Sequence, residues 1–110
     1  MPPYTLTQTH QDGPLTLYAL QHGTAVAQAG VLRLPAGGQS ILTVACKRGM
    51  LFCRLYDVAV AERCVVPAAI FGAATLEEML TKTPLALTPQ AEALGATLEM
   101  TALELLALFS

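Results

Sequence analysis

The chain has 110 residues, of which 54% are hydrophobic and 13% are charged, and its formal net charge is -2. This length fits a single domain that covers residues 1–110. The high apolar content excludes intrinsic disorder, which requires low hydrophobicity and high charge. The lack of a basic excess argues against nucleic acid as a partner, because that binding depends on Lys and Arg side chains that neutralise phosphates.

The composition also leaves a surplus of apolar side chains. A domain of this size buries only about two-thirds of the surface of its unfolded chain, so some apolar side chains should lie outside the core of a monomer. The longest uncharged stretches, residues 13–32 and 64–76, are interrupted by Gly and Pro and do not predict membrane spans. No secretion signal opens the chain. The sequence therefore predicts a cytoplasmic protein, without a membrane partner, whose copies cover one another's apolar surface.

Strand patterns occupy the first half of the chain. Residues 4–10, 15–20 and 24–34 are expected to form strands, with turns at residues 11–14 and 21–23, where Gly, Asp and Pro favour chain reversal. Gly30 lies inside the third of these strands and predicts a bulge or a bend. A loop rich in Gly and Pro follows at residues 35–38.

Two apolar runs, residues 40–46 and 50–56, flank Lys47-Arg48-Gly49 and predict a β-hairpin in which Gly49 supplies a positive φ. A two-residue turn at Arg48-Gly49 would pair Cys46 with Leu51 and place Cys46 and Cys53 on one face. A three-residue turn would pair Cys46 with Met50 and place the two thiols on opposite faces. The sequence leaves both registers open.

Helix signals dominate the second half. Thr75 and Thr101 are each followed by Glu three residues later, which is the spacing of a capping box, and Thr88-Pro89 predicts a third helix start. These signals predict helices from residue 76 to about 82, from 89 to Gly95, and from 102 to 109. Residues 65–71 predict a strand that Pro67 pushes toward an edge or a bulge, and residues 96–100 predict a short strand.

These elements together predict an α+β fold. A strand-rich N-terminal half should form a mostly antiparallel sheet, and three to four short helices of the C-terminal half should pack on it.

Charge is unevenly distributed along the chain. Residues 33–63 carry a net charge of +3, from five basic residues against Asp57 and Glu62, whereas residues 64–110 carry -4, from Lys82 against five Glu. These charges form either solvated faces or complementary patches that steer the assembly of subunits.

The order of short motifs resembles the YunC-like family of small bacterial and archaeal proteins, over roughly residues 15–109. The resemblance is carried by an ordered set of motifs: Leu34-Pro35, Gly49-x-x-x-Cys53-x-x-x-Asp57-Val58, Gly72-x-x-Thr75, Pro84-Leu85, Ala91-Glu92-x-Leu94-Gly95 and Met100-Thr101 before Glu104. It implies an α+β domain whose N-terminal β region mediates tetramer formation, and it names no chemistry.

Cys53 and Asp57 match the Cys-x-x-x-Asp element of that family. Arg54 stands where the family tends to have Gly, the segment after Asp57 is shorter than usual, and no Arg lies near residues 68–71.

A thiol-dependent or ligand-binding site near a subunit interface would use Cys53 and Asp57, with Arg54 as a candidate ligand-binding residue. A nucleophilic thiol requires a lowered pKa, which a cation or a His can provide. Arg48 or Arg54 could supply the charge, whereas no spacing ties His10 or His22 to the thiol. In the alternative interpretation, Cys53 fills core space and Asp57 caps a short segment over residues 58–63.

No motif in the sequence calls for a cofactor or a metal. Three Cys without a Cys-x-x-Cys motif predict neither a disulfide framework nor a zinc site. Gly37-Gly38 lacks the Lys of a phosphate-binding loop. The sequence therefore favours a non-enzymatic homo-oligomer, with the tetramer expected, over an enzyme with a site at Cys53 and Asp57.

Overall fold

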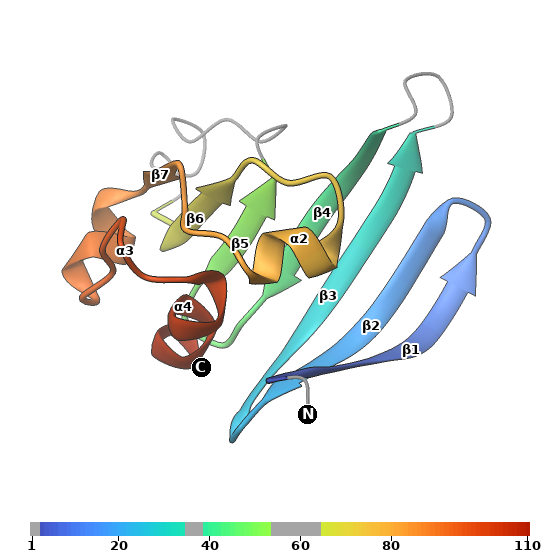
Figure 1. The fold of residues 1–110 in the computed structure, drawn as a ribbon, viewed down its shortest axis with the longest axis horizontal. Coiled ribbons are helices and arrows are strands. Elements are labelled where there is room, and N and C mark those ends of the chain that lie inside the picture. The colour runs from blue at the N-terminus through green and yellow to red at the C-terminus, as the bar shows by residue number, and fades with distance from the viewer. Residues whose placement is uncertain (1–2, 35–38, 54–64) are drawn as a thin grey trace.

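The computed structural model describes residues 3–34, 39–53 and 65–110. They form a seven-stranded sheet in which the strand order is the order in the chain. The strands are β1 (Thr5–Asp12), β2 (Leu15–His22), β3 (Ala25–Leu34), β4 (Gln39–Ala45), β5 (Met50–Cys53), β6 (Ala68–Phe71) and β7 (Ala86–Leu87). The helices are α2 (Leu76–Leu80), α3 (Pro89–Ala93) and α4 (Ala102–Phe109). This arrangement confirms an α+β fold with a strand-rich N-terminal half (Figure 1).

The first three strands are joined by two-residue turns. Asp12 pairs with Leu15 and His22 pairs with Ala25, and each turn begins with a Gly at positive φ, 57° at Gly13 and 61° at Gly23. Gly adopts this conformation without a steric penalty, which suits tight hairpins with the normal strand twist. The predicted strands are confirmed, and β1 and β2 extend two residues beyond their predicted ends.

The bulge lies in β1, so the prediction of a bulge or bend at Gly30 is wrong. The register between β1 and β2 shifts between Gln8 and His10, which leaves Thr9 as the extra residue. The ladders on both sides of Gly30 are continuous. The missing side chain at Gly30 matters for the surface of the sheet, as described below.

The β4–β5 hairpin takes neither of the two expected registers. Ala45 pairs with Met50, and the turn is Lys47-Arg48, closed by a hydrogen bond from Cys46 N to Gly49 O at 2.9 Å. Since paired residues share a face and side chains alternate along a strand, this register places Cys46 and Cys53 on the same face of the sheet.

Gly49 does not adopt a positive φ, contrary to the prediction. A Cβ atom at this position would lie only 2.7–2.9 Å from three ring carbons of Phe109, a side chain that is fully buried at the end of α4. Gly49 therefore admits the Phe109 ring against the hairpin, rather than serving as a turn residue of special conformation.

β6 lies inside the sheet and not at an edge. It pairs in parallel with β5 and antiparallel with β7, and it begins one residue after Pro67. Pro67 lacks only the N–H group, and its carbonyl accepts from Met50 N at 2.9 Å. Pro therefore fits at the entrance of an internal strand.

The segment that Asp57 was expected to cap lies outside the described residues.

The three predicted helix starts are confirmed. The side chains of Thr75, Thr88 and Thr101 each accept from a main-chain N–H three residues later. Gly95, with φ 104°, follows the end of α3 as predicted.

Two details of the second half differ from the prediction. α2 ends at Leu80 rather than near Lys82. Residues 96–100 form turns instead of a strand, with Met100 N donating to Thr97 O at 3.2 Å, and a strand that the sequence did not predict, the two-residue β7, lies between α2 and α3.

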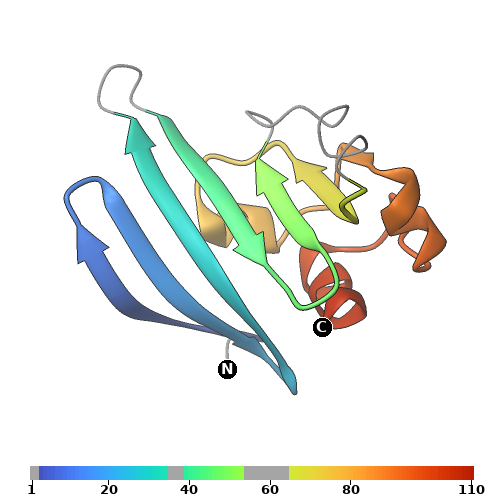
Figure 2. The same ribbon diagram turned by 180° about the vertical axis from the view of Figure 1, so that it is seen from behind.

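Helices α2 and α4 lie on one face of the sheet, which we call the helix side (Figure 1). α4 contacts β2, β3 and β5, and it contributes Leu105, Leu106 and Phe109 to the main core. On the other side of β5 and β6, a smaller buried cluster contains Phe52, Ala68 and Ile70. The described helices leave the other side of β2–β4 bare, as Figure 2 shows from behind.

Candidate functional site: the open face of the sheet

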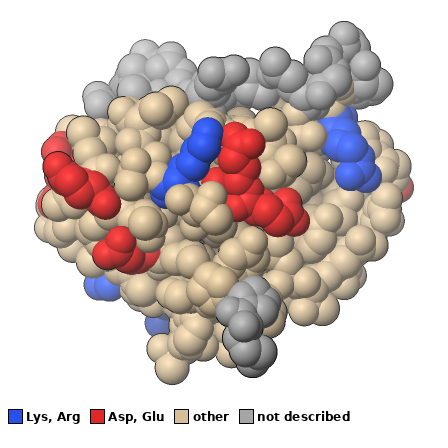
Figure 3. Space-filling view, in the orientation of Figure 1, with Lys and Arg blue, Asp and Glu red and all other residues tan. Residues whose placement is uncertain are grey.

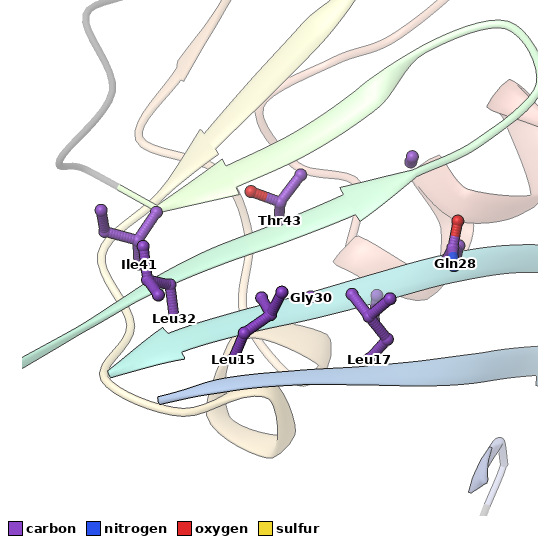
Figure 4. A pocket seen from close by; sticks show the side chains of 9 residues that line it. Leu15, Leu17, Gln28, Gly30, Leu32, Ile41 and Thr43 are labelled. Atoms are coloured by element: carbon purple, nitrogen blue, oxygen red, sulfur yellow. The ribbon is translucent and has the colours of Figure 1, made fainter. Parts of the chain in front are cut away.

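The side of β2–β4 that faces away from the helices, which we call the open face, is apolar. The strand registers place Leu15 and Leu17 of β2, Leu32 of β3 and Ile41 of β4 on it. These four side chains are partly exposed in the single chain. Figure 4 shows their side chains standing on the same surface of the strands. No helix among the described residues covers them.

A shallow hollow of about 350 Å³ lies in the middle of the open face. Gly30 lies at its floor, between Leu17 on β2 and Thr43 on β4 (Figure 4). A Cβ atom at Gly30 would meet only Cδ2 of Leu17, at 3.5 Å, which is an ordinary contact. Gly30 is therefore not required by the packing of the single chain, and its lack of a side chain shapes the surface instead.

The open face carries no charged residue. Its remaining members along β2–β4 are Ala19, Gln21, Val26, Gln28, Leu34 and Ala45. Arg33, the charged residue of these strands, lies on the helix side, opposite Ser40. On the neighbouring strand β1, the same side of the sheet presents Thr5, Thr7, His10 and Asp12. An apolar centre with a polar border is the anatomy of a protein–protein interface.

The size of this face is close to what a specific contact needs. Strands rise about 3.3 Å per residue and lie about 4.8 Å apart, so the open face of β2–β4 spans roughly 400 Å², and the polar border on β1 adds about 130 Å². Two copies in contact would bury roughly 800 Å² over β2–β4 and about 1,000 Å² with the β1 border included, and the second value is the lower bound for a specific interface. The largest apolar patch on a typical monomer is about 300–600 Å² and is often functional, so a patch of this size is a candidate interaction site.

Cys53, the candidate nucleophile, is packed in the main core. Its side chain is 2% exposed, and its Sγ accepts a hydrogen bond from Leu42 N at 3.4 Å. The two His residues lie on β1 and β2, three or more strands from β5, which places them roughly 14 Å or more away. The placement of Cys53 favours the interpretation in which it fills core space.

Cys46 shares that face of the sheet and is half-buried. Burial raises the pKa of its thiol to about 11, so it stays protonated near neutral pH. The guanidinium of Arg48, expected as a source of charge for a thiol, donates to the main-chain oxygens of Leu108 and Ser110. Arg48 thereby satisfies carbonyl groups at the end of α4.

Asp57, Arg54 and Cys64 lie outside the described residues, so a site formed by Cys53, Asp57 and Arg54 stays a prediction. Within the described ranges, no three His, Cys, Asp or Glu side chains are grouped closely enough to hold a metal ion. No helix in the part of the chain that the structure describes is long and apolar enough to cross a membrane.

The sequence predicted surplus apolar surface but not where it lies. A signal for its position exists in β2–β4, because these strands carry large apolar residues on both faces. On β2, Leu15 and Leu17 face one side and Leu20 the other, and on β4 the same holds for Ile41 and Val44, with Leu32 of β3 beside Ile41. Strands that are apolar on both faces are typical of sheets covered on both sides. Here the described helices cover one side.

Comparisons with known proteins bear on the fold. No family model matches the sequence, and no curated protein matches it. The structure is similar to the crystal structure of TA1206, a protein of unknown function from Thermoplasma acidophilum, with a TM-score of 0.70 and 19% sequence identity. The match covers 81% of this chain and 87% of that chain. At this identity, the similarity shows that the two chains share a fold.

Proposed function

We infer that this protein is a non-enzymatic homo-oligomeric module that assembles through its N-terminal β region. The observation that carries this proposal is the uncharged, apolar open face of β2–β4. A second copy is a fitting occupant, because a two-fold axis places the same patch against itself and an uncharged patch is complementary to itself. The resulting sandwich of two sheets would have helices on both outer sides.

The tetramer that the YunC-like resemblance implies is the expected final assembly. The face-to-face dimer is its building unit in this proposal. A second contact between two such dimers would complete a tetramer of two-fold symmetry.

The test is the mass of the protein in solution at micromolar concentration, measured by light scattering. We expect a multiple of 11.6 kDa for the wild-type chain. Leu32→Lys should give the monomer mass, because it places a charge in the centre of the apolar contact. The variant should remain folded, since Leu32 is partly exposed in the single chain and a Lys stem can lie along the apolar surface.

Leu98→Lys is the matched control. Leu98 is another exposed apolar side chain, and it lies in the turns between α3 and α4, outside the sheet. This variant should keep the wild-type mass. A wild-type monomer of 11.6 kDa, or a Leu32→Lys variant that stays assembled, would refute the proposal.

A further inference from the structure

A second hollow lies on the helix side, away from the open face. It has a volume of about 190 Å³ and lies between the start of α2 and strands β2–β4. Tyr18, Val31, Arg33 and Ser40 line it from the strands, and Leu76 and Glu77 line it from the helix. We call it the α2 cleft.

The two charged residues of the α2 cleft come from opposite walls. Arg33 stands on β3 and Glu77 on α2, and no ion pair joins them or engages either of them within the described residues. The Arg33 guanidinium donates one long hydrogen bond, 3.4 Å, to Thr16 Oγ1. Most donors of this guanidinium therefore have no partner among the described residues.

Glu77 differs from its neighbour Glu78 in this respect. Glu78 binds Lys82 at 3.0 Å and accepts from Ala74 N at 3.4 Å, so its carboxylate is already engaged. Neither a hydrogen bond nor an ion pair engages the Glu77 carboxylate in the described part of the chain. In Figure 3, acidic side chains near the centre of this face lie against one basic group, and a second basic group lies apart from them toward the right edge, with uncharged surface between.

The floor of the cleft is apolar. Its accessible apolar part is formed by Val31 beside Tyr18, and Leu42 and Leu76, which are 0% and 4% exposed, lie behind it. A cleft of this volume is smaller than the roughly 300–1,000 Å³ of sites for drug-sized ligands, so its occupant must be small.

We propose that the α2 cleft binds a small zwitterion with an apolar side group, of the class of free aliphatic α-amino acids. The ligand carboxylate lies against Arg33, because a guanidinium binds carboxylates with paired donors. The ligand ammonium lies against Glu77, which would repel a simple acid, and the side group contacts the apolar floor. This binding site is on the opposite side of the sheet from the open face, so it does not depend on the proposed assembly.

Chemical-shift titration of the isotope-labelled chain with L-leucine tests the proposal. We expect saturable shifts at the amides of Tyr18, Ser40 and Glu77. Two analogues separate the charges: 4-methylpentanoate lacks the ammonium group, and 3-methylbutylamine lacks the carboxylate. Each should bind about tenfold more weakly than leucine, which corresponds to the loss of one charge-assisted contact.

Arg33→Gln and Glu77→Gln should each weaken leucine binding about tenfold, whereas Glu78→Gln, the matched control on the same helix, should change it less than about twofold. Arg33→Lys retains the charge and serves if Arg33→Gln unfolds. Leucine shifts that do not saturate, or that map away from the cleft, would overturn the proposal. Equal binding of 4-methylpentanoate and leucine would also overturn it, because the site would then recognise acids and not zwitterions.

Discussion

Gly49 and Gly30 show how one residue type serves two purposes at the scale of single residues. At Gly49 the missing Cβ makes room for a fully buried ring, whereas at Gly30 it leaves a hollow on an uncovered surface. Both positions lie in the N-terminal sheet or its hairpins, and neither has a positive φ. The sequence alone cannot separate the two cases, because the neighbour that decides the role of Gly49 is Phe109, sixty residues away in the chain.

We predict that Gly49→Ala destabilises the protein by about 1–3 kcal/mol, since the Phe109 ring must move out of a packed core. Gly30→Ala is the matched control. It should be neutral or raise the free energy of unfolding by up to about 1 kcal/mol, because the new methyl group meets one ordinary contact and the unfolded chain loses entropy.

Urea unfolding of both variants measures the difference. The Leu32→Lys background should be used, so that changes in assembly do not contribute to the measured free energy of unfolding. Equal effects of the two substitutions would mean that the Phe109 ring does not pack against Gly49 as described.

The three helix starts are the part of the fold that could be predicted most closely from the sequence. Thr75, Thr88 and Thr101 act through main-chain groups within three residues, so local spacing is sufficient to find them. The sequence did not reveal that Thr88 also joins two elements. Its buried Oγ1 accepts from Ala68 N at 3.0 Å and donates to Val66 O at 2.9 Å, which ties the start of β6 to α3.

At the scale of elements, we predict that Thr88→Val lowers the free energy of unfolding by about 2–4 kcal/mol. The substitution leaves Ala68 N, Ala91 N and Val66 O without this partner at a site with no exposed surface on Thr88. Thr101→Val is the control, because it also removes a cap but at a site that water reaches, and should cost about 1 kcal/mol. Thermal or urea unfolding compares the two. Equal losses would contradict the linking role of Thr88.

The registers and edges of the sheet could be predicted only in part. The β4–β5 turn consists of Lys47 and Arg48, whereas both expected turns included Gly49. Gly49 and Arg48 instead pack against α4, and this packing, rather than a local preference of Gly for turns, fixes the position of the turn. Similarly, Pro67 suggested an edge strand, yet the parallel partner β5 uses the Pro67 carbonyl, which proline retains. In both cases the deciding partner is distant in sequence.

At the scale of the whole molecule, the surplus apolar side chains expected from the composition lie on the open face of β2–β4. The proposed assembly therefore depends on apolar contact and not on the unequal charges of residues 33–63 and 64–110. We predict that raising NaCl from about 0.05 M to about 1 M changes the dissociation constant less than about threefold or tightens assembly, since screening acts on charges and not on apolar burial.

Sedimentation at a series of salt concentrations measures this dependence. Weakening by about tenfold or more over that range would instead favour the complementary charge patches as the source of assembly. Leu98→Lys is expected to assemble whether apolar contact or charge patches drive assembly, so it provides a reference for the effect of one added charge.

The extra residue at Thr9 affects whether the outer strand of the sheet can pair with a strand of another chain. β1 is the outer strand of the sheet, eight residues long, and would otherwise offer a regular row of free peptide groups to another polypeptide. The bulge at Thr9 interrupts that row, so a strand of another chain cannot form regular main-chain hydrogen bonds along the full length of β1. Growth of the sheet into open-ended fibres is thereby discouraged at its long border, so closed complexes with a fixed number of copies are the expected product of the proposed assembly.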